Sequence, residues 1–163
     1  MEDNYLEKQP IIKAETVSRK DFLDSIYKGK SLPQDPRFLT TEEGGVFKYL
    51  DLSELIGIFA EKTERFFPVV EVNGQIVGIS ELQVNPNESN VVWIKHVSVD
   101  PKYQGNHYAS KVIEEIFRFA KEKGYSLEAS SYTNVGYEKL KKVCNAMSEK
   151  YGVVFKDTEG RIG

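Results

Sequence analysis

A short polar turn between two apolar segments carries residue types that could bind an anion. The turn spans residues 102–107, follows Asp100-Pro101 and contains Gly105. Proline ends the preceding strand because it lacks the amide that a central strand would donate. A helix that starts directly after such a turn presents free backbone N–H groups and the positive end of its dipole. This arrangement suits a phosphate or diphosphate group.

An expected strand and an expected helix position the turn. Residues 91–99 are apolar on both faces apart from Lys95, His96 and Ser98, which is typical of a central strand. Apolar residues then recur at helical spacing from Ala109 to Ala120, and Gly124 follows as a helix stop. The strand should therefore lead through the turn into the N-terminus of a helix with one buried face.

The segment VSVDPKYQGNHYASKVIEEI, residues 97–116, resembles the acetyl-CoA-binding segment of the GNAT acetyltransferase family. The family's pattern is Gln or Arg, two free positions, Gly, one free position, then Gly or Ala. Gln104 and Ala109 fit its first and last positions, and Tyr103 also matches. His107 stands where the family usually has glycine, which lets the backbone approach the diphosphate. The alternative is an ordinary strand, turn and helix with a surface loop.

The resemblance implies an acetyl-CoA site, with acetyl-CoA as co-substrate and no metal. Backbone groups of the strand would pair with the pantetheine arm, and the amides of the turn would hold the diphosphate. The Ser110 hydroxyl would assist, and Asn134 would either bind the arm or serve a turn. The implied residues are Val97, Ser98, Val99, Gln104, Gly105, Asn106, His107, Tyr108, Ala109, Ser110 and Asn134.

Acetyl transfer to an amine also needs a base for the amine and a proton source for the departing thiolate. Glu81, on the preceding strand, and His96, on the central strand, are the candidate bases. The resemblance points to Tyr137, with Tyr132 as second choice, as the acid. Each residue also has a purely structural interpretation. Glu81 could be a solvated carboxylate on a half-exposed strand, His96 a partly buried histidine with its hydrogen bonds satisfied, and Tyr137 a core residue.

Composition limits the possible partners. The chain has 163 residues, 40% hydrophobic and 29% charged, which suits one soluble domain with a real core. The net charge of −3 gives no support for a nucleic-acid partner. Cys144 is the one cysteine, so a disulfide within the chain and a cysteine-based metal site are excluded. Its position on a helical stripe favours a core thiol.

The N-terminus, MEDNYLEKQP, has no apolar run, so we expect no signal peptide. No stretch approaches the roughly 18 apolar residues of a membrane span. We therefore expect a cytoplasmic protein without a membrane partner.

The remaining sequence predicts strands and helices on either side of this segment. Residues 1–10 are expected to be a flexible N-terminus and 11–163 a single domain. The expected elements are a strand at 11–17, a helix from Ser18 to Gly29, a long loop at 30–46, a helix at 51–66 ended by Pro68, strands at 69–72 and 75–84 joined by Asn73-Gly74, a strand at 127–132, a helix at 137–151 and a strand at 153–155.

This order predicts an α+β fold with a mixed, mostly antiparallel central sheet flanked by helices. The strands that the helix at 109–123 joins should be parallel. The same order occurs in the GNAT family, so the resemblance covers residues 11–157 and extends to small bacterial and phage members.

The resemblance implies an acetyl-CoA-dependent N-acetyltransferase that moves an acetyl group directly to an amine. The acceptor would be a small molecule or a protein lysine or N-terminus. One alternative is a GNAT-like module of weak or no activity that binds acyl-CoA or a protein partner. Another is a different acyl donor, because a diphosphate site does not read the acyl group. The sequence leaves the oligomeric state open.

Overall fold

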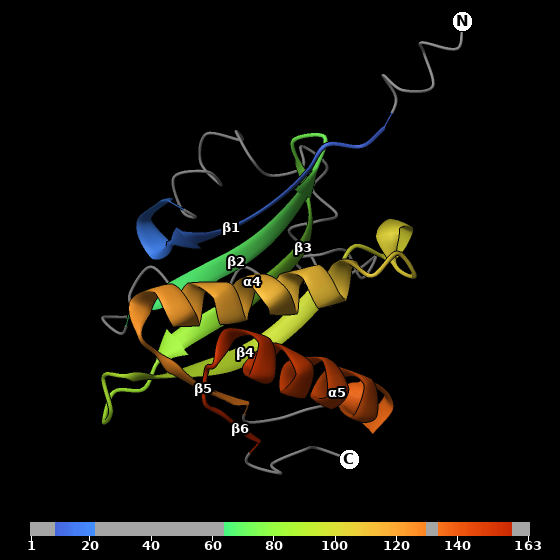
Figure 1. Ribbon diagram of the computed structural model, residues 1–163. Coiled ribbons are helices and arrows are strands. Elements are labelled where there is room, and N and C mark those ends of the chain that lie inside the picture. The colour runs from blue at the N-terminus through green and yellow to red at the C-terminus, as the bar shows by residue number, and fades with distance from the viewer. Residues whose placement is uncertain (1–8, 22–63, 130–133, 158–163) are drawn as a thin grey trace, which may run out of the picture.

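The computed structural model describes residues 9–21, 64–129 and 134–157, and these contain a single six-stranded sheet (Figure 1). A 3-10 turn, η2, and two long helices connect its second half. The elements are β1 (Ile12–Ser18), β2 (Arg65–Val72), β3 (Gln75–Val84), β4 (Val91–Val99), η2 (Pro101–Tyr103), α4 (Tyr108–Lys123), β5 (Ser126–Ala129), α5 (Asn134–Tyr151) and β6 (Phe155–Asp157).

The sheet is mixed and mostly antiparallel, as the sequence predicted. Its strand order is β1-β2-β3-β4-β5-β6, and each adjacent pair among the first four strands is antiparallel. β5 runs parallel to β4, and β6 runs parallel to β5. The parallel pairing of β4 and β5 confirms the expected crossover through α4, because such strands need a long connection.

Helix α4 lies across one face of the sheet, and α5 lies beside it over β5 and β6 (Figure 1). The apolar stripe of α4 is the buried side of the helix, as its spacing predicted. Gly124 ends the helix in the left-handed conformation with φ 76°, which glycine adopts without a Cβ penalty. The buried core between α4 and the sheet includes Val70, Leu82, Val92, Ile94, Val112, Ile113, Ile116 and Phe117.

The Asn73-Gly74 hairpin joins β2 and β3 where the sequence placed it. Both residues have positive φ, 52° and 82°, as the favoured two-residue hairpin turn requires. The Asn73 side-chain oxygen also accepts a hydrogen bond from the Ile11 amide at 3.0 Å. The predicted strand before Ser18 is confirmed as well, and the Ser18 hydroxyl caps the following turn by accepting the Asp21 amide at 3.1 Å.

The predicted helix at 51–66 is wrong at its end, because β2 already begins at Arg65 and runs through Pro68. Aromatic and β-branched residues around the proline favour a strand. Phe66 pairs with Leu82 of β3, and the next pairing on this ladder joins Val69 to Ile79. Pro68, which has no N–H to donate, lies between these two pairings and is itself the register partner of Thr16 on β1.

The C-terminal elements are also shifted from their predicted bounds. Helix α5 begins at Asn134, so Asn134 is not part of a turn as one alternative held. The predicted start at Tyr137 is therefore about one turn too late. The prediction began at the first apolar residue of the helix, whereas the first turn of a helix can be polar because its amides need no partner within the helix. The last strand is Phe155–Asp157 rather than 153–155. Gly152 ends α5 with φ 65°, and Val153 and Val154 complete the connection.

Several predictions fall outside the described residues. They concern the flexible N-terminus, the helix beyond Asp21, the loop at 30–46, the helical stripe at 51–63 and the end of the strand predicted at 127–132.

Candidate active site

Strand β4 carries a bulge halfway along its length. Within the described residues, β4 pairs with β5 from Val91–Ser126 to Ile94–Ala129. On the other side of β4, Glu81 pairs with His96 whereas Leu82 pairs with Ile94, so Lys95 is an extra residue in β4. A bulge of this kind bends the strand and increases its twist. The second half of β4 therefore differs in direction from its first half.

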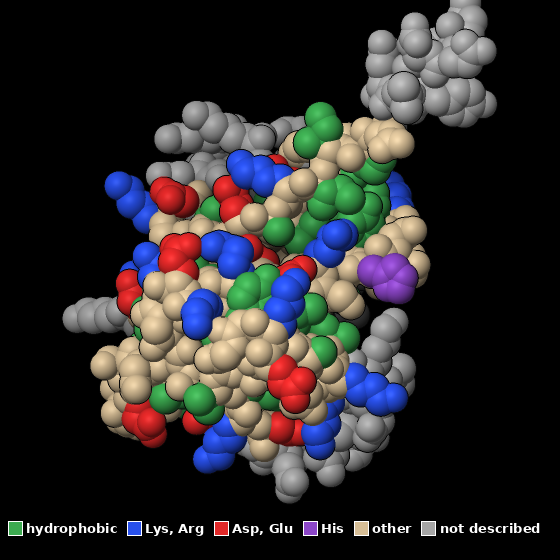
Figure 2. Space-filling view, in the orientation of Figure 1, with side chains coloured by type: hydrophobic (Ala, Val, Ile, Leu, Met, Phe, Trp, Pro, Cys, Tyr) green, Lys and Arg blue, Asp and Glu red, His purple; other side chains and the backbone are tan. Residues whose placement is uncertain are grey.

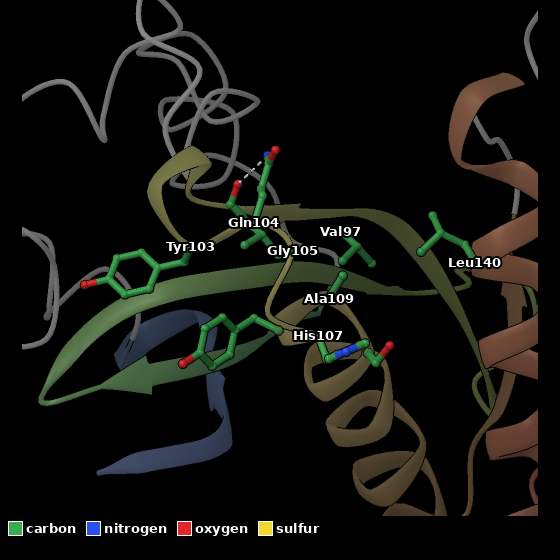
Figure 3. A pocket seen from close by; sticks show the side chains of 10 residues that line it. Val97, Tyr103, Gln104, Gly105, His107, Ala109 and Leu140 are labelled. Carbon is green, nitrogen blue, oxygen red and sulfur yellow. Dashed lines mark hydrogen bonds between the residues drawn. The ribbon is translucent and has the colours of Figure 1, made fainter. Parts of the chain in front are cut away.

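A cavity of about 410 Å³ lies beside this second half of β4. Its walls come from β4, the turn after η2, the first residues of α4 and one residue of α5. Figure 3 shows Leu140 of α5 pointing toward Val97, with Ala109 close by. The lining residues are Val97, Val99, Tyr103, Gln104, Gly105, His107, Tyr108, Ala109, Ser110 and Leu140.

Side chains of the turn hold the backbone that borders this cavity. The Asp100 carboxylate accepts a hydrogen bond from the backbone N–H of Lys102 at 3.0 Å. The side-chain amide of Gln104 donates a hydrogen bond to the Val99 carbonyl at 3.2 Å (Figure 3). The Asn106 side chain donates to the Tyr103 carbonyl at 3.3 Å. Gln104 therefore ties the turn back to the end of β4.

The N-terminus of α4 faces this turn without a side-chain cap. His107 is the N-cap residue and makes no capping hydrogen bond, and no acidic residue lies in the first turn. Such a helix end presents several backbone N–H groups and a positive dipole end. An anion at this end of the cavity would meet the amides of Tyr108, Ala109 and Ser110.

His107 adopts the left-handed conformation, with φ 65° and ψ 18°. Glycine reaches this region without steric cost, whereas other residues are strained there. The backbone thus has the conformation that suits the glycine expected from the family pattern, with histidine in its place. The His107 side chain is exposed at the rim of the cavity.

Most of the residues predicted to bind the cofactor meet at the cavity. Ser98 is 7% exposed and does not line it, and Asn106 holds the turn instead. Asn134 is the first residue of α5, and its role stays a prediction. The sequence did not assign Tyr103 or Leu140 to the site. Tyr103 was noted only as a match to the family, and Leu140 lies within the helix predicted at 137–151.

The predicted acid and bases occupy three elements near the site. Glu81 of β3 is 2% exposed and pairs with Arg65 of β2. His96 is its register partner on β4, one residue beyond the bulge. Tyr137 lies in the first turn of α5, three residues before Leu140. Which of them takes part in chemistry stays a prediction.

Charges of both signs are interspersed over the face that α4 and α5 form (Figure 2). Arg118 bridges Glu115 and Glu122 on α4, and Lys150 of α5 pairs with Glu114. Because these positive and negative side chains pair with one another, this face carries no large patch of charge of one sign.

The residues described contain no group of three or more His, Cys, Asp or Glu that could hold a metal ion. Neither of the two long helices in this part of the chain has the length and apolar composition to span a membrane.

A sequence model of the acetyltransferase (GNAT) family matches residues 30–139. No curated protein sequence matches the chain. Among solved structures, the aminoglycoside N-acetyltransferase AAC(6')-Iy in complex with CoA is similar, with 14% identity, 90% of each chain covered and a TM-score of 0.52.

Two further structures have a TM-score of 0.51 and 16% identity. One is an aminoglycoside acetyltransferase from an uncultured soil metagenomic sample, with 83% of this chain and 86% of that chain covered. The other is the ribosomal-protein-S18-alanine N-acetyltransferase of Escherichia coli, with 87% and 77% covered. These likenesses confirm the predicted fold, and the family model covers more than half of the sequence. The chain belongs to the GNAT acetyltransferase family.

Proposed function

We propose that the protein is an acetyl-CoA-dependent N-acetyltransferase that acts on an amine. The observation that carries this proposal is the cavity between the bent half of β4, the turn and the uncapped N-terminus of α4. It offers apolar walls beside an anion-binding end. A cofactor with a long arm and a diphosphate has matching chemistry, and the family membership of the chain supports the same choice.

The cofactor's two parts would use different groups of the protein. The backbone of Val97, Ser98 and Val99 would pair with the amides of the pantetheine arm. The amides of the turn and of the first turn of α4 would hold the diphosphate. Leu140 would cover the arm from α5, because it faces Val97 across the cavity (Figure 3).

The reaction joins the acceptor nitrogen to the acetyl carbonyl carbon and breaks the carbon–sulfur bond. The amine must be neutral to attack, and it loses one proton as the amide forms. That proton goes to a base, and the departing thiolate takes a proton from an acid. The products are an N-acetylated amine and CoA.

We assign the base to His96 and a positioning role to Glu81. Glu81 is 2% exposed and held by Arg65, so it has little access to an incoming amine. His96 follows the bulge and directly precedes Val97, which lines the cavity. Histidine also titrates near neutral pH, which suits proton transfer. We keep Tyr137 as the acid, because a phenol with an ordinary pKa near 10 can protonate a thiolate.

Kinetics would test these roles. His96→Gln should remove most of kcat and the acidic limb of its pH profile, while CoA binding persists. Glu81→Gln should lower kcat but retain that limb. If His96→Gln retains kcat, the assignment of the base is wrong.

A thermal melt with millimolar acetyl-CoA would test the cofactor assignment. A ligand that binds only the folded state stabilises it by about 2.7 kcal/mol at one hundred times its dissociation constant. We expect Tm to rise by several degrees with acetyl-CoA or CoA and to stay unchanged with adenosine. Unchanged Tm with all three would contradict the proposal.

Turnover separates an enzyme from a binding module. His107 in place of glycine and the locked carboxylate of Glu81 favour the module as second candidate. Release of CoA from acetyl-CoA should be followed with aminoglycosides, polyamines and peptides with free N-termini. Binding without turnover on any of these amines would favour the module, and propionyl- and succinyl-CoA would show the acyl preference.

The acceptor class stays a broad proposal. Proteins of similar fold act on aminoglycosides and on the alanine of a ribosomal protein, so both a small molecule and a protein N-terminus or lysine are candidates. We further propose that the reaction takes place in the cytoplasm, without a nucleic-acid or membrane partner.

A further inference from the structure

We infer that the imidazole of His107 is itself a ligand for a phosphate group of the cofactor. This inference rests on the proposed function, because it assigns an additional contact within the same cavity. The phosphate is either the diphosphate or the 3′-phosphate of CoA. Both present the same chemistry, oxygen anions that accept an N–H hydrogen bond.

The backbone of His107 is the first reason. Asn73 and His107 are the two residues other than glycine with positive φ in the described part of the chain. Asn73 has a local explanation, because asparagine tolerates this conformation and its side chain accepts the Ile11 amide. Histidine is also enriched in this conformation, but, unlike Asn73, His107 makes no capping hydrogen bond with its side chain. Strained residues of this kind cluster at ligand sites.

The position of the side chain is the second reason. His107 is exposed and lines the cavity, at the end where the amides of α4 begin. The next residue, Tyr108, is 9% exposed, and its ring packs edge-on against Tyr103 with centroids 6.0 Å apart. This packing fixes the backbone next to His107. An imidazole N–H at this rim would meet an anion that the helix amides already hold.

The absence of competing negative charge is the third reason. The first turn of α4 contains no acidic residue. The Asp100 carboxylate, at the start of the turn, is 3% exposed and accepts the Lys102 amide. An anion bound by His107 would therefore not meet an exposed carboxylate from either of these segments.

Replacement of His107 by glycine separates the two effects of the residue. In His107→Gly the backbone strain is relieved, so the free protein should melt at a higher temperature than the wild type. The same variant should bind CoA about 10-fold or more weakly, because it loses a hydrogen bond to a charged group. His107→Asn, which tolerates positive φ but has a shorter side chain, should also bind CoA more weakly than the wild type.

Isothermal titration with CoA and with dephospho-CoA would measure these affinities. If glycine weakens both ligands equally, His107 contacts the diphosphate. If it weakens CoA alone, His107 contacts the 3′-phosphate. Asn73→Gly is the matched control, because it changes a positive-φ residue in the β2–β3 hairpin, and its affinity for CoA should equal that of the wild type.

The two proposals fail in different ways. If the wild type does not bind CoA, the proposed function is wrong. If the wild type binds CoA and His107→Gly binds it equally or more tightly, the cofactor site stands and the inference about His107 is overturned.

Discussion

Arg65 of β2 and Glu81 of β3 form an ion pair inside the sheet, with side chains 13% and 2% exposed. The pairing is diagonal, because Arg65 lies opposite Gln83 in the ladder. Glu81 in turn lies opposite His96 of β4. The pair therefore links β2 to the part of β3 that lies opposite the bulge of β4. It places a buried charge directly beside the proposed catalytic strand.

Removal of Arg65 should destabilise the protein strongly. Arg65→Met leaves the Glu81 carboxylate buried without its partner, which typically costs about 3–5 kcal/mol. Urea unfolding would measure the free energy. The double variant Arg65→Met/Glu81→Leu should recover much of the loss, because it removes the charge as well.

The exposed pair of Lys13 and Glu15 provides the control for this experiment. Their side chains are 63% and 41% exposed, and the atoms of the pair are 3.3 Å apart. Lys13→Met should cost no more than about 1 kcal/mol. Equal losses in the two single variants would contradict a structural role for the buried pair.

Gly78 allows α4 to lie close to the sheet. A Cβ built at Gly78 would lie 2.8 Å from a methyl carbon of Val112. Valine has little rotamer freedom in a helix, so Gly78→Ala should force the helix and strand apart and cost about 1–3 kcal/mol. Urea unfolding of this variant, of Val112→Ala and of the double variant would measure the coupling. We expect the double variant to be more stable than the sum of the single effects predicts, and strict additivity would argue against the clash.

Local signals in the sequence predicted the parts of the fold that depend on short-range geometry. Asn73-Gly74 specified the hairpin because both residues tolerate positive φ. The apolar spacing of α4 and Gly124 at its end specified a helix whose buried face meets the sheet.

Features that depend on several strands together were not predictable from the sequence. Pro68 ends a helix in local terms, yet it lies inside β2 because β1 and the neighbouring aromatic residues favour a strand. The extra residue Lys95 of β4 appears only in the pairing of β4 with β3. Leu140 joins the cavity because α5 lies next to α4, which its sequence pattern does not indicate.

Glu114 should make the stability depend on pH. Hydrogen bonds from Lys150 and Tyr151, the latter at 2.8 Å, lower the pKa of Glu114 below its ordinary value. A group with a lowered pKa in the folded state stabilises the protein above its unfolded pKa, and this contribution is lost as pH falls through the folded pKa. Because Glu114 is partly exposed, solvent screening makes the effect small.

Thermal melts between pH 7 and pH 3 would test this contribution. Glu114→Gln should melt at a lower temperature than the wild type at pH 7, and the difference should shrink as pH falls below about 4. Glu149→Gln, at an exposed position of α5, is the control and should keep a constant offset from the wild type. A difference for Glu114→Gln that grows toward low pH would contradict the assignment.

Cys144 should be unreactive in the folded protein. Burial, with a smaller contribution from Asp157, raises the pKa of the Cys144 thiol to about 12. At pH 8 the thiol is therefore almost entirely protonated, and because the side chain is 4% exposed, a reagent can hardly reach it. A disulfide reagent such as Ellman's should therefore report no thiol in the native protein and one thiol per chain in guanidinium. The same reagent could then follow CoA release without a background from the enzyme. Rapid labelling of the native protein would show that α5 opens locally, because the thiol lies on the side of α5 that packs into the core.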